Sequence, residues 1–220
     1  MASIVQGECD PDFAAVRVAF EKNFRDHGEL GAAVAVYHKG KPVVDLWGGL
    51  RDADRKLPWE VDTICCMMSV AKGISALCIA KLAERKLLTL DDRVSKYWPE
   101  FAAQGKESIT IRQALGHLAC IPVTDLASEG DFYSYKKMIA AIAGQKPLWP
   151  IATVQVYHSS TLGFIAGEVL RRITGQTIGQ FLRENLQRPL GADYFIGLTA
   201  DEQRRCATML RSAGNSIIAQ

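Results

Sequence analysis

The residues best suited to chemistry are Ser69 and Lys72, three positions apart in the apolar run MMSVAKGISALCIAKL (residues 67–82). Lys72 is the only charged residue between Ile64 and Ala80. Residues three apart share one face of a helix. Burial and a helix N-terminus both disfavour the charged form of a lysine, and a neutral lysine can take the proton of a neighbouring serine. The pair therefore predicts a serine nucleophile with a lysine base on a buried helix.

The same four letters also fit a simpler interpretation, in which Ser69 caps a helix and the ammonium group of Lys72 reaches solvent. Ser-x-x-Lys arises readily by chance. The chain contains a second copy, Ser134-Tyr135-Lys136-Lys137, in a polar and amphipathic stretch. We expect this second copy to lie on the surface.

Tyr157 is the third candidate, in the segment TVQVYHSSTLGFIAGEVL. The alternation around Val154 and Val156 predicts a short strand that leads into a helix capped by Ser159 or its neighbour. Tyr157 would then face the front of a helix, where the positive potential stabilises a phenolate. The alternative is a half-buried tyrosine whose hydroxyl bonds the backbone.

Composition and missing motifs exclude several classes of protein. The 220 residues include 26 basic and 24 acidic side chains, a balance that predicts no nucleic-acid or membrane partner. A secretory signal and a membrane-spanning segment are both missing, so we expect a cytoplasmic protein. Without zinc-like cysteine spacing or a nucleotide-binding loop, no metal and no cofactor are predicted. Cys65 and Cys66 are expected to pack in the interior, and His117 is expected to be structural.

Two regions must position the candidate residues. Residues 1–60 predict a helix over 11–28 and a β-hairpin over 31–49 around Lys39-Gly40-Lys41. Residues 61–220 predict a mainly helical region, with helices over 131–143 and 160–174 and capping boxes that begin at Thr89, Thr110, Thr177 and Thr199. The fold class is α+β. A lone hairpin is marginally stable, so either helices cover it or the sheet has further strands.

Five segments in order give the chain a resemblance to a known family. They are Ser69-Val70-Ala71-Lys72, LTLDDRVSKYWPEF, ITIRQALGHLACIP, Tyr157-His158-Ser159 and LRENLQRPLGADYFIGL. Together they resemble the serine β-lactamase-like superfamily, which includes the penicillin-binding proteins. Within it the chain is most similar to the carboxylesterases related to class C β-lactamases, called family VIII esterases.

The resemblance implies a fold, a reaction and roles for individual residues. A helical region packs on an antiparallel sheet, Ser69 is acylated, Lys72 takes its proton, and Tyr157 shuttles protons to the leaving group. Ser159 stands where many relatives have asparagine, which makes it a weak candidate for substrate binding. The implied activity is hydrolysis of small carboxylic esters through an acyl-enzyme, without a cofactor. Alternatives are β-lactamase or D-amino-acid peptidase activity, transesterification, and a non-catalytic truncated homologue.

Two departures from the family pattern also generate expectations. Relatives continue past residue 220 through further strands, one of which supplies a backbone donor of the oxyanion hole. We therefore expect an incomplete sheet, a chain truncated at its C-terminus, and a second chain as the partner that could complete the sheet. In addition, Cys120 occupies a position where relatives tend to have glycine, which matters if the backbone there has a positive φ.

Overall fold

The computed structural model describes residues 4–210, which divide into two compact units. The sheet unit comprises the chain up to Cys66 together with the segment from Leu198, and the helical unit is Met67–Gly197. No helix within residues 4–210 is both long and apolar enough to cross a membrane. Each unit is built on a hydrophobic core of its own.

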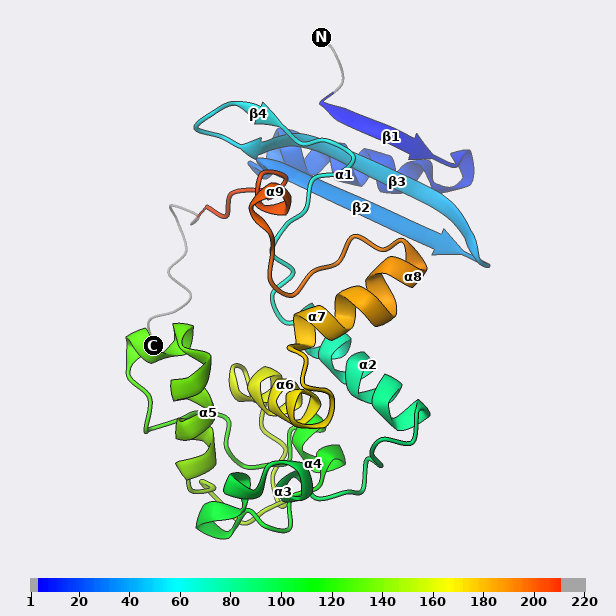
Figure 1. Cartoon of the computed structure of the whole chain (residues 1–220). Coiled ribbons are helices and arrows are strands. Elements are labelled where there is room, and N and C mark those ends of the chain that lie inside the picture. The colour runs from blue at the N-terminus through cyan, green and yellow to red at the C-terminus, as the bar shows by residue number, and fades with distance from the viewer. Residues whose placement is uncertain (1–3, 211–220) are drawn as a thin grey trace. The chain divides into compact units, whose positions relative to one another are not determined.

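The sheet unit contains an antiparallel sheet with the strand order β1-β3-β2 (Figure 1). Its strands are β1 (Val5–Cys9), β2 (Gly31–His38), β3 (Lys41–Asp52) and the short β4 (Leu57–Pro58), which pairs with the end of β3. The predicted hairpin is confirmed, and Lys39 and Gly40 turn it with φ values of 50° and 77°. Positive φ at both central residues matches the twist of the strands that they join.

Helix α1 (Ala14–Asp26) covers one face of this sheet (Figure 1), after a 3₁₀ turn at Pro11–Phe13. Val5, Phe20, Val44 and Leu46 form the buried centre of the interface. The predicted helix over 11–28 is thus confirmed, although its first three residues form the 3₁₀ turn and it ends at Asp26. Val18 was expected on its apolar face but is 62% exposed, because it falls on the side of the helix opposite Phe20. The segment from Leu198, with α9 (Ala200–Gln203), completes the unit.

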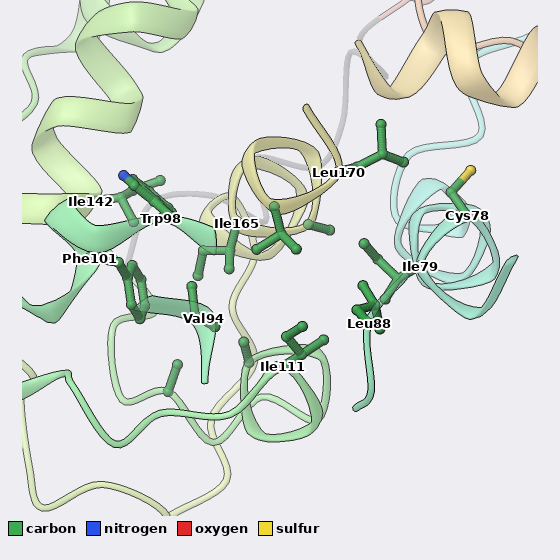
Figure 2. Packing of buried hydrophobic residues seen from close by; sticks show 14 of the residues in the cluster. Cys78, Ile79, Leu88, Val94, Trp98, Phe101, Ile111, Ile142, Ile165 and Leu170 are labelled. Carbon is green, nitrogen blue, oxygen red and sulfur yellow. The ribbon is translucent and has the colours of Figure 1, made fainter. Parts of the chain in front are cut away.

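The helical unit is organised around α6 (Thr161–Thr174), which is buried along most of its length. The other elements are α2 (Val70–Glu84), α3 (Val94–Tyr97), η2 (Pro99–Gly105), α4 (Ile111–Leu115), η3 (Glu129–Tyr133), α5 (Tyr135–Gly144), α7 (Ile178–Leu182), η4 (Arg183–Gln187) and α8 (Arg188–Leu190). Figure 2 shows Ile165 and Leu170 of α6 among the apolar side chains of α2, α3, α4 and α5. This core fixes the helices on which the candidate site is built.

Local signals predicted most of these boundaries. The capping boxes at Thr110, Thr177 and Thr199 each begin a helix, and Gly175 ends α6 with a φ of 75°. The box at Thr89 does not begin a helix: its backbone N–H bonds the carboxylate of Asp92, and α3 starts only at Val94.

Two larger expectations were wrong. Helix α2 is not buried all round, because Val70 and Leu77 are 49% and 46% exposed; only the face that packs against α6 and α7 is buried. The segment around Val154 and Val156 is not a strand, since the Val156 N–H bonds the carbonyl of His117 outside any sheet. In addition, β1 was not predicted, because its sequence VQGEC has little apolar alternation.

Lys106 is a fully buried lysine that joins two parts of the helical unit. Its ammonium group donates to the carbonyl oxygens of Ala103, Ala143 and Gln145 at 2.8, 2.9 and 2.5 Å. Burial lowers its pKa to about 8, so the charged form, with three donors, still predominates at neutral pH. Lys106 therefore ties the end of η2 to the C-terminal end of α5.

Replacing Lys106 with methionine tests this role. Three carbonyls, of which that of Gln145 is in a buried residue, would lose their donor, so we expect the free energy of unfolding to fall by about 2–4 kcal/mol. Urea denaturation followed by circular dichroism measures the change. Lys146→Met is the matched control, because Lys146 is exposed, and its effect should stay within about 0.5 kcal/mol. Equal stability of the two variants would show that Lys106 contributes nothing through these bonds.

Candidate active site

Ser69 stands immediately before α2 as its N-cap residue, as the sequence predicted. Its side chain does not cap the helix. The N–H groups of Val70, Ala71 and Lys72 instead bond the carbonyls of the three residues from Met67 to Ser69. The preceding residue, Met68, has a φ of 46°, a conformation that is strained for a non-glycine residue and that occurs at functional sites. The hydroxyl of Ser69 is therefore available for other partners.

Lys72 donates to that hydroxyl, with 3.2 Å between its Nζ and Ser69 Oγ. The contact follows from helix geometry, because residues three apart lie one above the other. Lys72 is only partly buried, so the full burial expected from the apolar sequence is not observed. The reason is that α2 packs against its neighbours along one face, away from its first turn. The second Ser-x-x-Lys copy is on the surface as predicted, since Lys137 is 67% exposed and bonds Asp131.

Tyr157 reaches the same oxygen from a segment 88 residues further along the chain. Its hydroxyl lies 2.5 Å from Ser69 Oγ, and the Lys72 Nζ lies 4.7 Å from the centre of its ring. The hydrogen bond with Ser69, followed by that with Lys72 and the lysine charge, lowers the pKa of Tyr157 below its ordinary value. The structure thus brings together the three residues that the sequence singled out.

Two histidines beside this trio received little weight in the sequence. The rings of His117 and Tyr157 are 5.0 Å apart, and those of His117 and His158 are 5.6 Å apart. The Nδ1 atom of His117 accepts a hydrogen bond from the backbone N–H of His158. The only sequence signal was the position of His158 directly after Tyr157. The contact with His117 spans 41 residues and could not be read from local spacing.

The remaining candidates, Ser159 and three cysteines, differ in burial. Ser159 is exposed and lies beyond the buried His158, two residues after Tyr157. Cys65 and Cys66 are exposed, so the expected burial of these thiols is wrong. Cys120 is buried and has a φ of 60°, so the position where relatives tend to have glycine does adopt a left-handed backbone here. No disulfide joins cysteines within residues 4–210.

The shared hydrogen bond predicts how Tyr157 titrates. Removing the Ser69 hydroxyl by Ser69→Ala should raise the pKa of Tyr157, because the hydrogen bond with Ser69 is the main cause of its lowering. Ultraviolet difference titration measures the change, with Tyr157→Phe identifying the signal of this tyrosine. Ser134→Ala, in the second Ser-x-x-Lys copy, should leave the titration unchanged. An unaltered midpoint in Ser69→Ala would show that the two hydroxyls do not interact.

Comparison with known proteins places the chain in a family. A family model described as Beta-lactamase matches residues 18–219. The chain is 34% identical over 193 residues to the esterase/beta-lactamase LipL of Mycobacterium tuberculosis, an alignment that covers 86% of this chain and 44% of LipL. The chain thus spans less than half the length of this relative.

Solved structures show the same fold. A penicillin-binding protein homologue from Caulobacter crescentus is 41% identical with a TM-score of 0.89, over 95% of this chain and 57% of that one. A family VIII carboxylesterase is 43% identical with a TM-score of 0.86, over 94% and 57%. The predicted fold class and family resemblance are confirmed. With its serine, lysine and tyrosine on the helical unit of this fold, the chain belongs to the Beta-lactamase family.

Proposed function

We propose that this chain carries the nucleophile of a serine hydrolase that cleaves small carboxylic esters. The observation that carries the proposal is the convergence of two proton-carrying groups on one oxygen. Lys72 Nζ and Tyr157 Oη both lie within hydrogen-bond distance of Ser69 Oγ. A serine hydroxyl is a weak nucleophile until a neighbouring base takes its proton. The arrangement thus combines a nucleophile with two groups that can move its proton.

The proposed reaction has two stages. Ser69 Oγ attacks the ester carbonyl while Lys72, in its neutral form, accepts the hydroxyl proton, and Tyr157 passes a proton to the departing alkoxide, which leaves as an alcohol. Water then attacks the acylated serine and gives a proton to the oxygen of Tyr157. The carboxylic acid departs, and Lys72 returns its extra proton to Ser69, which restores all three groups. Lys72 and Tyr157 contact each other directly and through Ser69, so the proposed proton transfers run between groups that are already in contact.

The relatives support the choice of ester substrates. LipL is named an esterase/beta-lactamase, and one of the solved structures is titled a family VIII carboxylesterase. Their lengths exceed that of this chain, which covers 44% of LipL and 57% of the carboxylesterase. The first of these names also makes β-lactam hydrolysis the second candidate function, since the same serine would be acylated by the strained amide.

Covalent labelling of Ser69 tests the proposal. We expect a fluorophosphonate to form one adduct on the peptide that contains Ser69, and p-nitrophenyl butyrate to be turned over. Ser69→Ala should abolish both, while Ser134→Ala should retain both. Lys72→Met should slow labelling by about a hundredfold or more, the usual effect of losing a general base. Mass spectrometry of the intact and digested chain gives the readout.

Three outcomes would change the assignment. Retained turnover in Ser69→Ala would exclude this nucleophile. Faster turnover of nitrocefin than of the butyrate ester would make β-lactam hydrolysis the leading activity. No adduct on the folded wild-type chain, alone or with a partner chain, would favour a non-catalytic role.

We also propose that a second chain pairs with the open edge of β2. Among the described strands β2 lies at one end of the order β1-β3-β2, and such an edge offers unpaired N–H and C=O groups to another strand. The family resemblance implies that further strands of the sheet provide a backbone donor of the oxyanion hole, and the loss of one such donor typically slows acyl transfer about a hundredfold or more. A partner chain that extends the sheet would take the place of those strands.

Hydrogen exchange at β2 tests for this partner. If the partner is a second copy, both the protection of β2 amides and ester turnover per chain should rise with chain concentration. Mass spectrometry of deuterium uptake measures protection, and β3, paired on both sides by β1 and β2, is the internal control. Full turnover while β2 exchanges rapidly would show that no strand is needed at this edge.

A further inference from the structure

Tyr157 is held from both sides by one residue, His117. The N–H of Val156, just before the tyrosine, bonds the backbone oxygen of His117 at 3.2 Å. The N–H of His158, just after it, bonds the side-chain Nδ1 of His117 at 3.0 Å. The imidazole also packs against the phenol ring, with 5.0 Å between the ring centres. His117 therefore contacts Tyr157 or its immediate neighbours at three points.

The direction of these bonds fixes the protonation state of His117. A backbone N–H can only donate, so Nδ1 of His117 must be the unprotonated nitrogen, and the neutral ring carries its proton on Nε2. A protonated ring would have a donor at each nitrogen and would lose the bond to His158. The hydrogen bond from the N–H of His158 to His117 thus requires a neutral imidazole.

The surroundings favour that neutral form. The titratable groups that face the ring are Lys72 on α2 and Tyr157 and His158 on the adjoining segment. Burial, and then the charge of Lys72, lower the pKa of His117 below the ordinary histidine value. The charged ring consequently forms only at a more acidic pH than for an exposed histidine.

The hydrogen bonds of His158 define its protonation state as well. Its fully buried ring accepts a hydrogen bond at Nε2 from the N–H of Ile121. Its proton must then lie on Nδ1, which is 2.6 Å from the carbonyl of Val156. Burial is the main cause that lowers its pKa as well. The two histidines therefore adopt opposite neutral tautomers, one with the proton on Nε2 and the other with the proton on Nδ1.

The backbone around His117 is strained in a manner that suits a functional role. His117 has a φ of 64° and Cys120 a φ of 60°. Such conformations are uncommon for residues other than glycine, asparagine, aspartate and histidine, so the strain falls mainly on Cys120. Such strain persists where the surrounding contacts enforce it. Here the enforcing contacts are the hydrogen bonds between residues 116–121 and 148–158.

We propose that His117 is a positioning residue that aligns Tyr157 on Ser69 through its Nδ1 acceptor, and that protonation of His117 releases this alignment. The catalytic consequence rests on the proposed function. The structural consequence does not, because the contact between the Tyr157 and Ser69 hydroxyls can be observed without any substrate. The sequence alone had indicated only a structural histidine at this position.

Two substitutions of His117 test its Nδ1 acceptor and its aromatic ring separately. In His117→Asn the amide oxygen can occupy the place of Nδ1, asparagine tolerates a positive φ, and the acceptor cannot titrate. In His117→Phe the ring contact remains but the acceptor is lost. His27→Asn is the matched control, because His27 is an exposed histidine in the sheet unit.

The first measurement follows the pKa of Tyr157 by ultraviolet difference titration and needs no activity. We expect His117→Phe to raise this pKa toward the ordinary tyrosine value, because the phenol would leave Ser69, while His117→Asn should keep it low. Nitrogen-15 NMR of the wild-type chain should show opposite tautomers for His117 and His158. An unchanged Tyr157 titration in both variants, or an Nδ1-protonated His117, would overturn the proposal. If His117→Phe fails to fold, the tautomers and the asparagine variant still decide.

The second measurement is the rate of fluorophosphonate labelling of Ser69 as a function of pH. Labelling of the wild type and of His27→Asn should fall on the acidic side as His117 is protonated. His117→Asn should lose the part of this fall that belongs to His117 and keep its rate near neutrality. His117→Phe should be slower than the wild type by about a hundredfold near neutrality, the scale expected for a misplaced catalytic group. The difference should shrink on the acidic side, where the wild type loses the alignment as well.

The outcomes distinguish the two proposals. An unlabelled wild-type chain with the expected tautomers and Tyr157 titration would contradict the hydrolase proposal alone. A labelled wild type whose asparagine variant keeps the full acidic fall, and whose phenylalanine variant reacts at the wild-type rate, would contradict the role of His117 alone. With ester substrates, the loss in His117→Phe should appear in kcat more than in KM, since the residue orients a catalytic group.

Discussion

The structure of the candidate site depends on the hydrogen bonds that join two irregular segments, residues 116–121 and 148–158. Leu148, Ala152 and Val156 donate their N–H groups to the carbonyls of Cys120, Leu118 and His117. Side chains extend the same contact, as Gln155 bonds the carbonyl of Gly116 and Thr161 bonds that of Ile121. Neither segment has the regular ladder of a sheet, so each bond must be made by a particular residue. Together these bonds deliver Tyr157 to a serine 88 residues away in the sequence.

The two contacts to Ser69 Oγ therefore differ in origin. The lysine contact is made within the first turn of a single helix and needs little beyond that helix. The tyrosine contact depends on segments far apart in the sequence. Helix α4, with its capping box at Thr110, leads to His117, α6 follows Tyr157, and a hydrogen bond between the two histidines joins these segments. We therefore expect substitutions in the core of the helical unit to displace Tyr157 from Ser69 before they disturb the contact between Ser69 and Lys72. The serine and lysine would keep their mutual geometry as long as α2 remains helical.

The predictions from the sequence divide in the same way, into features set by neighbouring residues and features set by distant segments. The hairpin turn, the Ser69 and Lys72 pair and three of the four capping boxes depend on residues a few positions apart, and these predictions agree with the structure. The approach of Tyr157 to Ser69 was obtained through the family resemblance, since spacing alone left a backbone-bonded tyrosine equally open. The failures concern burial and pairing. The exposed face of α2, the missing strand around Val154 and the unpredicted β1 all depend on which partners lie nearby, which a single segment does not record.

The buried charges of the helical unit show how it can hold an irregular site in place. Glu168 on α6 is fully buried, and although burial opposes its ionisation, hydrogen bonds from Arg171 and Arg172 outweigh this effect and keep its pKa below the usual range. Tyr135 of α5 donates to the same carboxylate, and Lys106 joins η2 to the end of α5. Buried polar groups of this kind have specific partners and few alternative arrangements, unlike apolar contacts, which tolerate sliding. They restrict how α5, α6 and η2 can shift, and α6 begins at Thr161, four residues after Tyr157. Because the segment that bears Tyr157 leads directly into α6, fixing the start of α6 restricts the positions that the phenol ring of Tyr157 can adopt.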